Sequence, residues 1–201
     1  MTGQVDVYLS LSSPWTYLGW DRLHEIVDRH DTCLNYFPVD FGLVFPATGG
    51  VALPRRAPAR QAYRMAELKR WKDFLGDAAF NPVPKYFPVD NMLASLMAVA
   101  ARERGTNIGG FCRAVLSAVW CEDKDISDPA VLRSIADGCG LDGTSLAEAA
   151  GRANTAQQFA ADSERAIERG VFGAPTFVFR DELFWGQDRL DFLDRALAGG
   201  Q

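Results

Sequence analysis

Hydrophobic and polar positions alternate at the start of the chain and then recur at helical spacing. Val5, Val7 and Leu9 alternate with more polar neighbours, which predicts a strand. The segment 14–30 carries its apolar residues on one helical face, and 33–39 again has the composition of a strand. This β-α-β order requires a crossover connection and favours a parallel pair of strands.

The central part of the chain predicts helices that follow one long loop. Residues 41–58 are rich in Gly and Pro, and we expect them to form a loop. Helical patterns follow at 59–75, 91–104, 107–120, from Pro129 onward, and at 144–169, where two pieces part near Asn154.

The end of the chain returns to a strand pattern. Residues 176–179 and 183–185 predict a hairpin, and 189–197 predict a last helix. We therefore predict an α/β protein with a thioredoxin-like fold, β-α-β followed by β-β-α, that carries a large all-helical insertion. Residues 1–45 and 170–201 would form the thioredoxin-like domain, and 46–169 the loop and helical insertion.

Composition narrows the class of protein. A length of 201 residues suits one domain with an insertion, and 48% hydrophobic residues can build a core. The net charge of -5 argues against a nucleic-acid-binding surface, and no apolar run is long enough to span a membrane. No export signal is visible, and the four cysteines show neither a CxxC motif nor metal-ligand spacing with the two histidines. We expect free thiols, no metal site and a cytoplasmic location.

The most informative motif is Ser13-Pro14, where the first strand runs into the first helix. Pro14 suits the first helical position, so Ser13 is expected to be the N-cap, beside N–H groups that favour negative charge. One interpretation is that Ser13 is only a helix cap and has no role in a reaction. A disulfide oxidoreductase would need cysteines where Ser13 and Thr16 stand.

A serine hydrolase is excluded because neither histidine can reach Ser13. His24 lies several helical turns away and His30 further still, so we expect both to be surface or capping residues. What remains is a site that binds a thiol from outside, as a thiolate, through a hydroxyl and helix N–H groups.

Two later segments are further candidates. Pro175, after Gly173, suits a cis peptide that leaves the backbone of Ala174 free for an extended peptide ligand, although it could also simply begin a strand. Gly186-Gln187-Asp188 precedes the last helix, where Asp188 could hold an ammonium group or merely cap the helix.

A basic patch and several aromatic residues complete the candidates. Arg55, Arg56, Arg60 and Arg64 are clustered, and the last three recur every four residues, as on one helix face. This face is either solvated or receives an anionic substrate. An apolar pocket or ordinary core packing would account for Trp15, Tyr17, Trp20, Phe45 and Trp185.

Together, these motifs resemble the 2-hydroxychromene-2-carboxylate isomerases, relatives of kappa-class glutathione transferases in the DsbA-like thioredoxin superfamily. The resemblance runs over nearly the whole chain. It is carried by Ser13 to Leu18, Ala47 to Gly49, Asp125 to Pro129, Gly170 to Thr176 and Phe184 to Arg189.

The resemblance implies a glutathione-dependent homodimer. Ser13 would activate the glutathione thiol, and Ala174, before Pro175, would pair with its cysteinyl part. The γ-glutamyl end would be held by Trp185, Gly186, Gln187 and Asp188. Reversible thiolate addition would interconvert 2-hydroxychromene-2-carboxylate and trans-o-hydroxybenzylidenepyruvate, a step in naphthalene-type aromatic degradation.

Some positions depart from the family pattern. Pro46 and Gly50 stand where relatives often have Lys and Asn. These departures fall on the substrate side, where Arg55, Arg56, Tyr86 and Trp15 are the candidate contacts. The alternatives are a kappa-like transferase that conjugates an electrophile, or a thioredoxin-like binding module without turnover.

Overall fold

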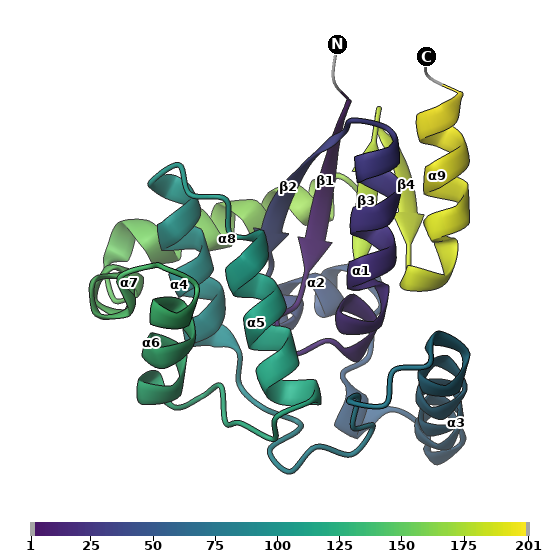
Figure 1. Ribbon diagram of the computed structural model, residues 1–201, viewed down its shortest axis with the longest axis horizontal. Coiled ribbons are helices and arrows are strands. Elements are labelled where there is room, and N and C mark those ends of the chain that lie inside the picture. The colour runs from purple at the N-terminus through teal and green to yellow at the C-terminus, as the bar shows by residue number, and fades with distance from the viewer. Residues whose placement is uncertain (1–2, 200–201) are drawn as a thin grey trace.

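The protein was analysed as a computed structural model, which describes residues 3–199. Its centre is a four-stranded mixed sheet in the order β2-β1-β3-β4 (Figure 1). The strands are β1 (Gln4–Leu9), β2 (Cys33–Pro38), β3 (Thr176–Phe179) and β4 (Glu182–Trp185). β1 and β2 are parallel, with Gln4 opposite Cys33, whereas β3 is antiparallel to both β1 and β4.

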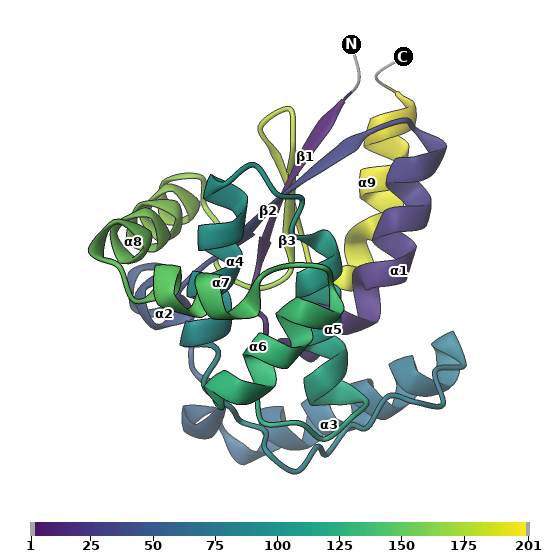
Figure 2. The same ribbon diagram turned by 60° about the vertical axis from the view of Figure 1, so that its left-hand side comes forward.

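The helices surround this sheet on both faces. They are α1 (Pro14–Arg29), α2 (Phe41–Thr48), α3 (Pro58–Leu75), α4 (Met92–Glu103), α5 (Gly109–Trp120), α6 (Pro129–Gly138), α7 (Gly143–Ala150), α8 (Ala153–Glu168) and α9 (Leu190–Ala198). α1 and α9 cover one face, whereas α2 and α8 cover the other (Figures 1 and 2). The predicted thioredoxin-like fold with a helical insertion is confirmed.

The alternation along β1 divides its side chains between two hydrophobic cores. Val5, Val7 and Leu9 point into the larger core, which includes α1, α9 and the helices of the insertion. Tyr8 points to the opposite face and packs near Ala166 of α8. Because successive strand residues face opposite sides, one strand anchors both layers.

The helices of the insertion pack on both sides of the sheet, with α5 beside α1 and α8 on the opposite face. α5 contacts α1, and the small side chains of α4 let α7 and α8 approach closely. α8 also packs on β2 and α2, so it joins the insertion to the sheet. The division of the chain into a thioredoxin-like domain (1–45 and 170–201) and an insertion (46–169) stays a prediction.

Within residues 3–199, no helix has the length and apolarity needed to cross a membrane.

The prediction of a loop over 41–58 is wrong in its first half. Residues 41–48 form α2, and 53–55 form a short 3-10 turn. Asp40 caps α2 by accepting a hydrogen bond from Gly42 N, at 2.7 Å, and Gly49 ends it in the left-handed region (φ 77°). The helix accommodates Pro46 because it is only two turns long and apolar enough to pack on α8.

The histidine predictions are half right. His30 follows the last turn of α1 as its C-cap and bonds to Asp194 at 2.6 Å. His24 is a half-buried packing residue rather than a surface or capping one: its ring stacks on Trp20 and its Nε2 lies 2.8 Å from the hydroxyl of Tyr36. The partner of His24 is Tyr36 on the next strand, β2, and helical spacing within α1 cannot reveal such a contact.

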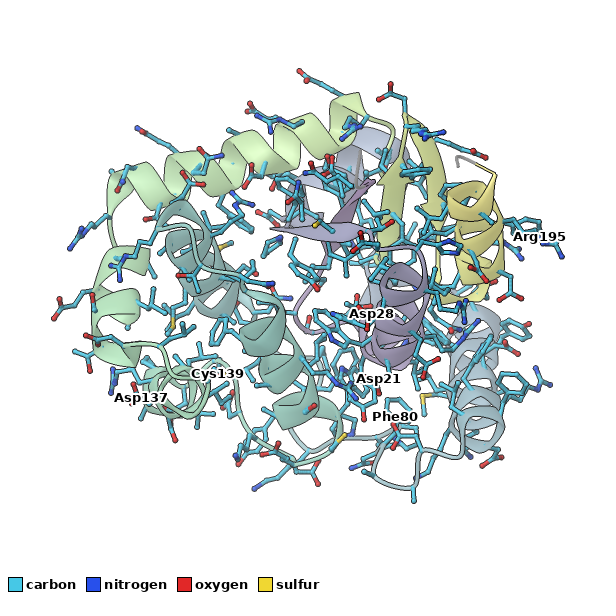
Figure 3. All side chains as sticks on the ribbon, turned by 45° about the horizontal axis from the view of Figure 1, so that its top comes forward. Asp21, Asp28, Phe80, Asp137, Cys139 and Arg195 are labelled. Carbon is cyan, nitrogen blue, oxygen red and sulfur yellow. The ribbon has the colours of Figure 1, made fainter. Side chains whose placement is uncertain are left out.

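α3 lies at the edge of the molecule, apart from the sheet (Figure 2). Its Leu68 is fully buried in the larger core, and the chain that follows α3 adds further contacts. Phe80, which is labelled in Figure 3, is fully buried and stacks on both Tyr17 of α1 and Trp120 of α5. The hydroxyl of Tyr17 also donates to Asp77, at 2.8 Å, so the end of α3 is tied to the start of α1.

A buried ion pair joins α4 and α8, and it yields a prediction on stability. Asp162 is 1% exposed and accepts from Arg102 at 2.5 Å. We expect Asp162→Asn to lower the free energy of unfolding by about 3 kcal/mol, because it removes the buried counter-charge of Arg102, which then keeps only the half-exposed Glu103 at 3.3 Å. Urea denaturation measures this, with Asp181→Asn as the control. Asp181 is 95% exposed in its pair with Arg169, so its loss should cost less than about 0.5 kcal/mol. Equal losses would contradict the expectation.

Candidate active site

A cavity of about 620 Å³ opens where the parallel strands β1 and β2 end. Its walls come from six segments that are far apart in the sequence: the β1–α1 turn, the β2–α2 connection with the loop after α2, one face of α3, the 87–91 connection, residues 172–174, and Trp185. Clefts at the carboxyl ends of parallel strands are common ligand sites in α/β proteins.

Ser13 stands at the floor of this cavity, as the N-cap of α1. Its backbone is extended (φ −80°, ψ 123°), and its Oγ accepts a hydrogen bond from Thr16 N at 3.3 Å. The predicted cap is confirmed. No residue of 3–199 accepts the hydroxyl proton of Ser13, so this O–H is left for a ligand beside the N–H groups of the first turn.

The second wall is the backbone before β3. The Ala174–Pro175 peptide bond is cis, as suggested for this position. Among the described residues, neither the N–H nor the C=O of Ala174 has a hydrogen-bond partner, although Ala174 is half-buried and lines the cavity. The carbonyl of Pro175 accepts from Gly186 N at 2.9 Å and so continues the sheet. A peptide ligand can therefore pair with Ala174 without displacing another strand.

Of the residues predicted at 185–188, only Trp185 lines the cavity. Trp185 lines the cavity, 49% exposed, and lies so close to Gly173 that a Cβ there would stand 2.3 Å from its Nε1. Gln187 is 2% exposed, and its side chain turns toward α1, where it accepts from Arg22 at 3.1 Å. Asp188 is half exposed, next to Gly186 and 3.7 Å from Arg189, outside the lining of the cavity.

Three arginines line another part of the cavity, on the loop after α2 and on α3, and we call this part the arginine wall. Arg56, Arg60 and Arg64 all face the cavity, but Arg56 precedes α3, so the three do not share one helix face as expected. Arg56 is instead fixed by a bond from its Nε to the carbonyl of Val51, at 2.7 Å. Arg55 is exposed and lies outside the cavity lining.

The charge on this wall is uncompensated. In the part of the chain that the structure describes, none of the three guanidinium groups forms an ion pair with a carboxylate. Burial and the neighbouring Arg56 lower the pKa of Arg64 to about 10, and burial and Arg60 lower the pKa of Arg56. Arg64 rests over the ring of Phe87, 5.1 Å from its centroid. Such a wall favours an anion.

Only some of the predicted aromatic contacts line the cavity. Trp15 lines the cavity, whereas Tyr86 is exposed beneath Lys85 and outside it. Tyr17 and Trp20 are core residues. Aromatic rings that the sequence did not single out for this pocket complete the walls: Phe41, Phe87 and Phe172, together with the expected Phe45.

Sequence reasoning missed three polar residues of the wall beside Ser13. Ser10, Ser12 and Asn91 line the cavity and bond to one another. Asn91 is about eighty positions from the serines, and no local pattern links them. Only the fold brings the 87–91 connection against the β1–α1 turn.

Comparison with known proteins identifies the class first. The family model of the DSBA-like thioredoxin domain matches residues 4–198. The cytosolic disulfide reductase DsbM from Pseudomonas aeruginosa shares the fold, with a TM-score of 0.63 at 19% identity, over 98% of this chain and all of that one. The fold is thus that of a DsbA-like thioredoxin protein.

More similar relatives narrow this class. The 2-hydroxychromene-2-carboxylate isomerase of Sphingobium xenophagum is 31% identical over 98% of this chain and 99% of its own, and that of Pseudomonas sp. (strain C18) is 27% identical over 97% and 90%. A solved 2-hydroxychromene-2-carboxylate isomerase superposes with a TM-score of 0.78 at 27% identity, over 98% of this chain and 95% of the other. The chain therefore belongs to the 2-hydroxychromene-2-carboxylate isomerase family of DsbA-like thioredoxin proteins.

The uncompensated arginine wall should weaken the ligand-free protein. We expect Arg64→Met to raise the free energy of unfolding by about 1 kcal/mol, because an apolar side chain of similar length removes a charge that is desolvated without a carboxylate partner. Urea denaturation of the ligand-free protein measures this. The exposed Arg55→Met is the matched control and should change stability by less than about 0.5 kcal/mol. A clear loss of stability in Arg64→Met would contradict the absence of a partner.

Proposed function

We propose that this protein is a glutathione-dependent isomerase that interconverts 2-hydroxychromene-2-carboxylate and trans-o-hydroxybenzylidenepyruvate, or a closely related aromatic α-keto acid. The observation that carries the proposal is a free hydroxyl at the N-terminus of α1, where a redox relative would need a cysteine. The names of the similar relatives support the isomerase activity and its role in aromatic degradation.

The residues present fit glutathione as the source of the thiol. Glutathione is a peptide, and the unpaired backbone of Ala174 offers it one donor and one acceptor. Ser13 stands in the same cavity, and Trp185 supplies an apolar side, while Asp188 beyond it is a carboxylate suited to an ammonium group. Bound there, glutathione would supply a thiolate that adds reversibly to a conjugated double bond, so that the bond can rotate.

Ser13 has two tasks in this proposal. Its Oγ holds the first turn of α1 through Thr16 N, and its own O–H donates to the sulfur. Together with the dipole of α1, this donor stabilises negative charge on the sulfur and lowers the pKa of the bound thiol. The reaction needs no redox partner, because the thiol leaves unchanged.

The arginine wall would bind the carboxylate of the substrate. Arg56 and Arg64 keep terminal N–H groups that no carboxylate of the described chain occupies, and a planar guanidinium fits a carboxylate with two parallel bonds. The aromatic ring of the substrate would lie among the phenylalanines of the walls. This wall would supply a positive charge in place of the Lys that relatives often have where Pro46 stands.

Two further expectations belong to this proposal. Glutathione chemistry and four free cysteines suit a reducing cytoplasm. We also expect a homodimer, and sedimentation velocity measures this directly.

The product distinguishes the proposal from its alternatives. We expect glutathione to bind in calorimetric titration at millimolar concentration and to catalyse isomerisation without being consumed. Mass spectrometry should then find the substrate isomer and no stable adduct. A stable glutathione adduct would instead make the protein a transferase. Absence of glutathione binding would leave the thioredoxin-like binding module.

The role of Ser13 can be tested separately. We expect Ser13→Ala to raise the pKa of the bound thiol by about one unit or more, toward the free value of about 8.5, and to lower kcat about 100-fold. Ultraviolet absorbance of the thiolate gives this pKa. The pH below which the rate falls should rise together with the pKa of the bound thiol.

Ser13→Thr is the matched control, because it keeps both the hydroxyl and the cap. It should retain most of the thiol pKa shift. An unchanged thiol pKa in Ser13→Ala would overturn the role assigned to Ser13.

A further inference from the structure

A hydrogen-bonded group of three side chains lies on the cavity wall next to Ser13. Asn91 donates from Nδ2 to the hydroxyl oxygen of Ser10 at 2.8 Å and to that of Ser12 at 2.7 Å. The two hydroxyl oxygens are 3.3 Å apart, and all three residues line the cavity. We call this group the serine pair with Asn91.

The hydrogens of this group can be assigned one by one. An Asn amide has two N–H hydrogens, and both are used on the two serines. Each serine has one hydroxyl hydrogen, and one of the two can bond to the other serine. No other residue within 3–199 accepts from either hydroxyl, so one O–H is left without an acceptor beside the cavity.

We propose that this remaining O–H is a second hydroxyl donor of the site, and that it binds the keto oxygen of an aromatic α-keto acid. The inference rests on the proposed function and adds a residue role to it. Ser13 would serve the sulfur, whereas the serine pair would stabilise the negative charge that develops on the substrate's carbonyl oxygen.

The position of the pair favours the substrate over the thiol. The 87–91 connection carries Asn91 at one end and Phe87, beneath Arg64, at the other. An α-keto acid has its keto oxygen next to its carboxylate, so a carboxylate held by Arg64 over Phe87 would leave the keto oxygen on the side of the 87–91 connection, which ends at Asn91. The peptide-binding backbone of Ala174 belongs to a different wall of the cavity.

The hydrogen bonds from Asn91 also improve the donor. A hydroxyl that already accepts a strong bond is polarised and donates its own hydrogen more strongly. The amide fixes both hydroxyls in place, so little reorganisation is needed when charge develops. Both effects require that Asn91 donate to the serines, as it does here.

The test compares two ligands that cannot be isomerised. 4-Phenyl-2-oxobutanoate has the keto group, and 4-phenylbutanoate lacks it. We expect the wild-type protein to bind the keto acid about fivefold more tightly by calorimetry, as one hydrogen bond provides. In the double variant Ser10→Ala/Ser12→Ala this preference should fall to about one, and kcat should fall about 100-fold.

Two further measurements, the thiol pKa and the Ser127→Ala control, distinguish a role toward the substrate from a role toward the thiol and from a general loss of structure. The pKa of bound glutathione's thiol should stay at its wild-type value in the double variant, since Ser13 is intact. Ser127→Ala, whose hydroxyl donates to Asp125 outside the cavity, should keep both the ligand preference and the rate. A shifted thiol pKa with an unchanged keto preference would overturn the proposal, as would an equal loss of affinity for both ligands.

A second variant covers the case in which the double variant fails to fold. Asn91→Asp turns two donors into acceptors, so both serine hydroxyls would donate to the new carboxylate and no O–H would remain. Its negative charge should weaken both ligands alike, while the keto preference should again fall to about one. A retained preference would overturn the proposal. Because the ligand comparison needs neither glutathione nor turnover, it remains decisive if the isomerase activity itself is absent.

Discussion

The first turn of α1 leaves backbone N–H groups without partners, and Ser13 satisfies one of them while keeping its own hydroxyl proton free. This arrangement depends on the strand that precedes it. β1 lies in the middle of the sheet, with side chains in both cores, so its end is held firmly. The turn that follows is further fixed by Asn91, which bonds to serines on either side of Leu11. A buried strand thus aims a helix terminus and its cap into the cavity.

The arginine wall lowers the stability that the ligand-free protein would otherwise have. Three guanidinium groups gather without a carboxylate, and burial lowers the pKa of Arg64 and of Arg56. Sites that bind anions commonly hold such charge at the expense of stability. The end of α2 and the loop after it account for one departure from the family pattern, at Gly50. A Cβ at position 50 would stand 2.3 Å from the ring of Phe45, so an Asn cannot occupy this position while Phe45 lines the cavity.

Local signals were sufficient for the helix cap and for most elements. Ser13 followed by Pro14 is readable because the chemistry of a helix start involves only neighbouring residues. α2 was missed because its Gly and Pro content outweighed the cap at Asp40, which acts through a single backbone bond. Arg56 joins the arginine wall through the loop after α2 rather than through a helix face. The contact between Asn91 and the serines depends on packing between distant segments, which no window of sequence contains.

The chain's own cysteines agree with the proposal that the thiol comes from outside. Burial raises the pKa of Cys112, Cys121 and Cys139, so each stays a protonated, weakly reactive thiol. Cys121 bonds to Tyr17 at the end of α5, where it serves packing, and Cys33 is exposed at the start of β2. None of the described residues lining the cavity is a cysteine. Under the proposed function, the start of α1 would therefore have no internal thiol to act on, and the unpaired backbone of Ala174 fits a peptide that would bring one.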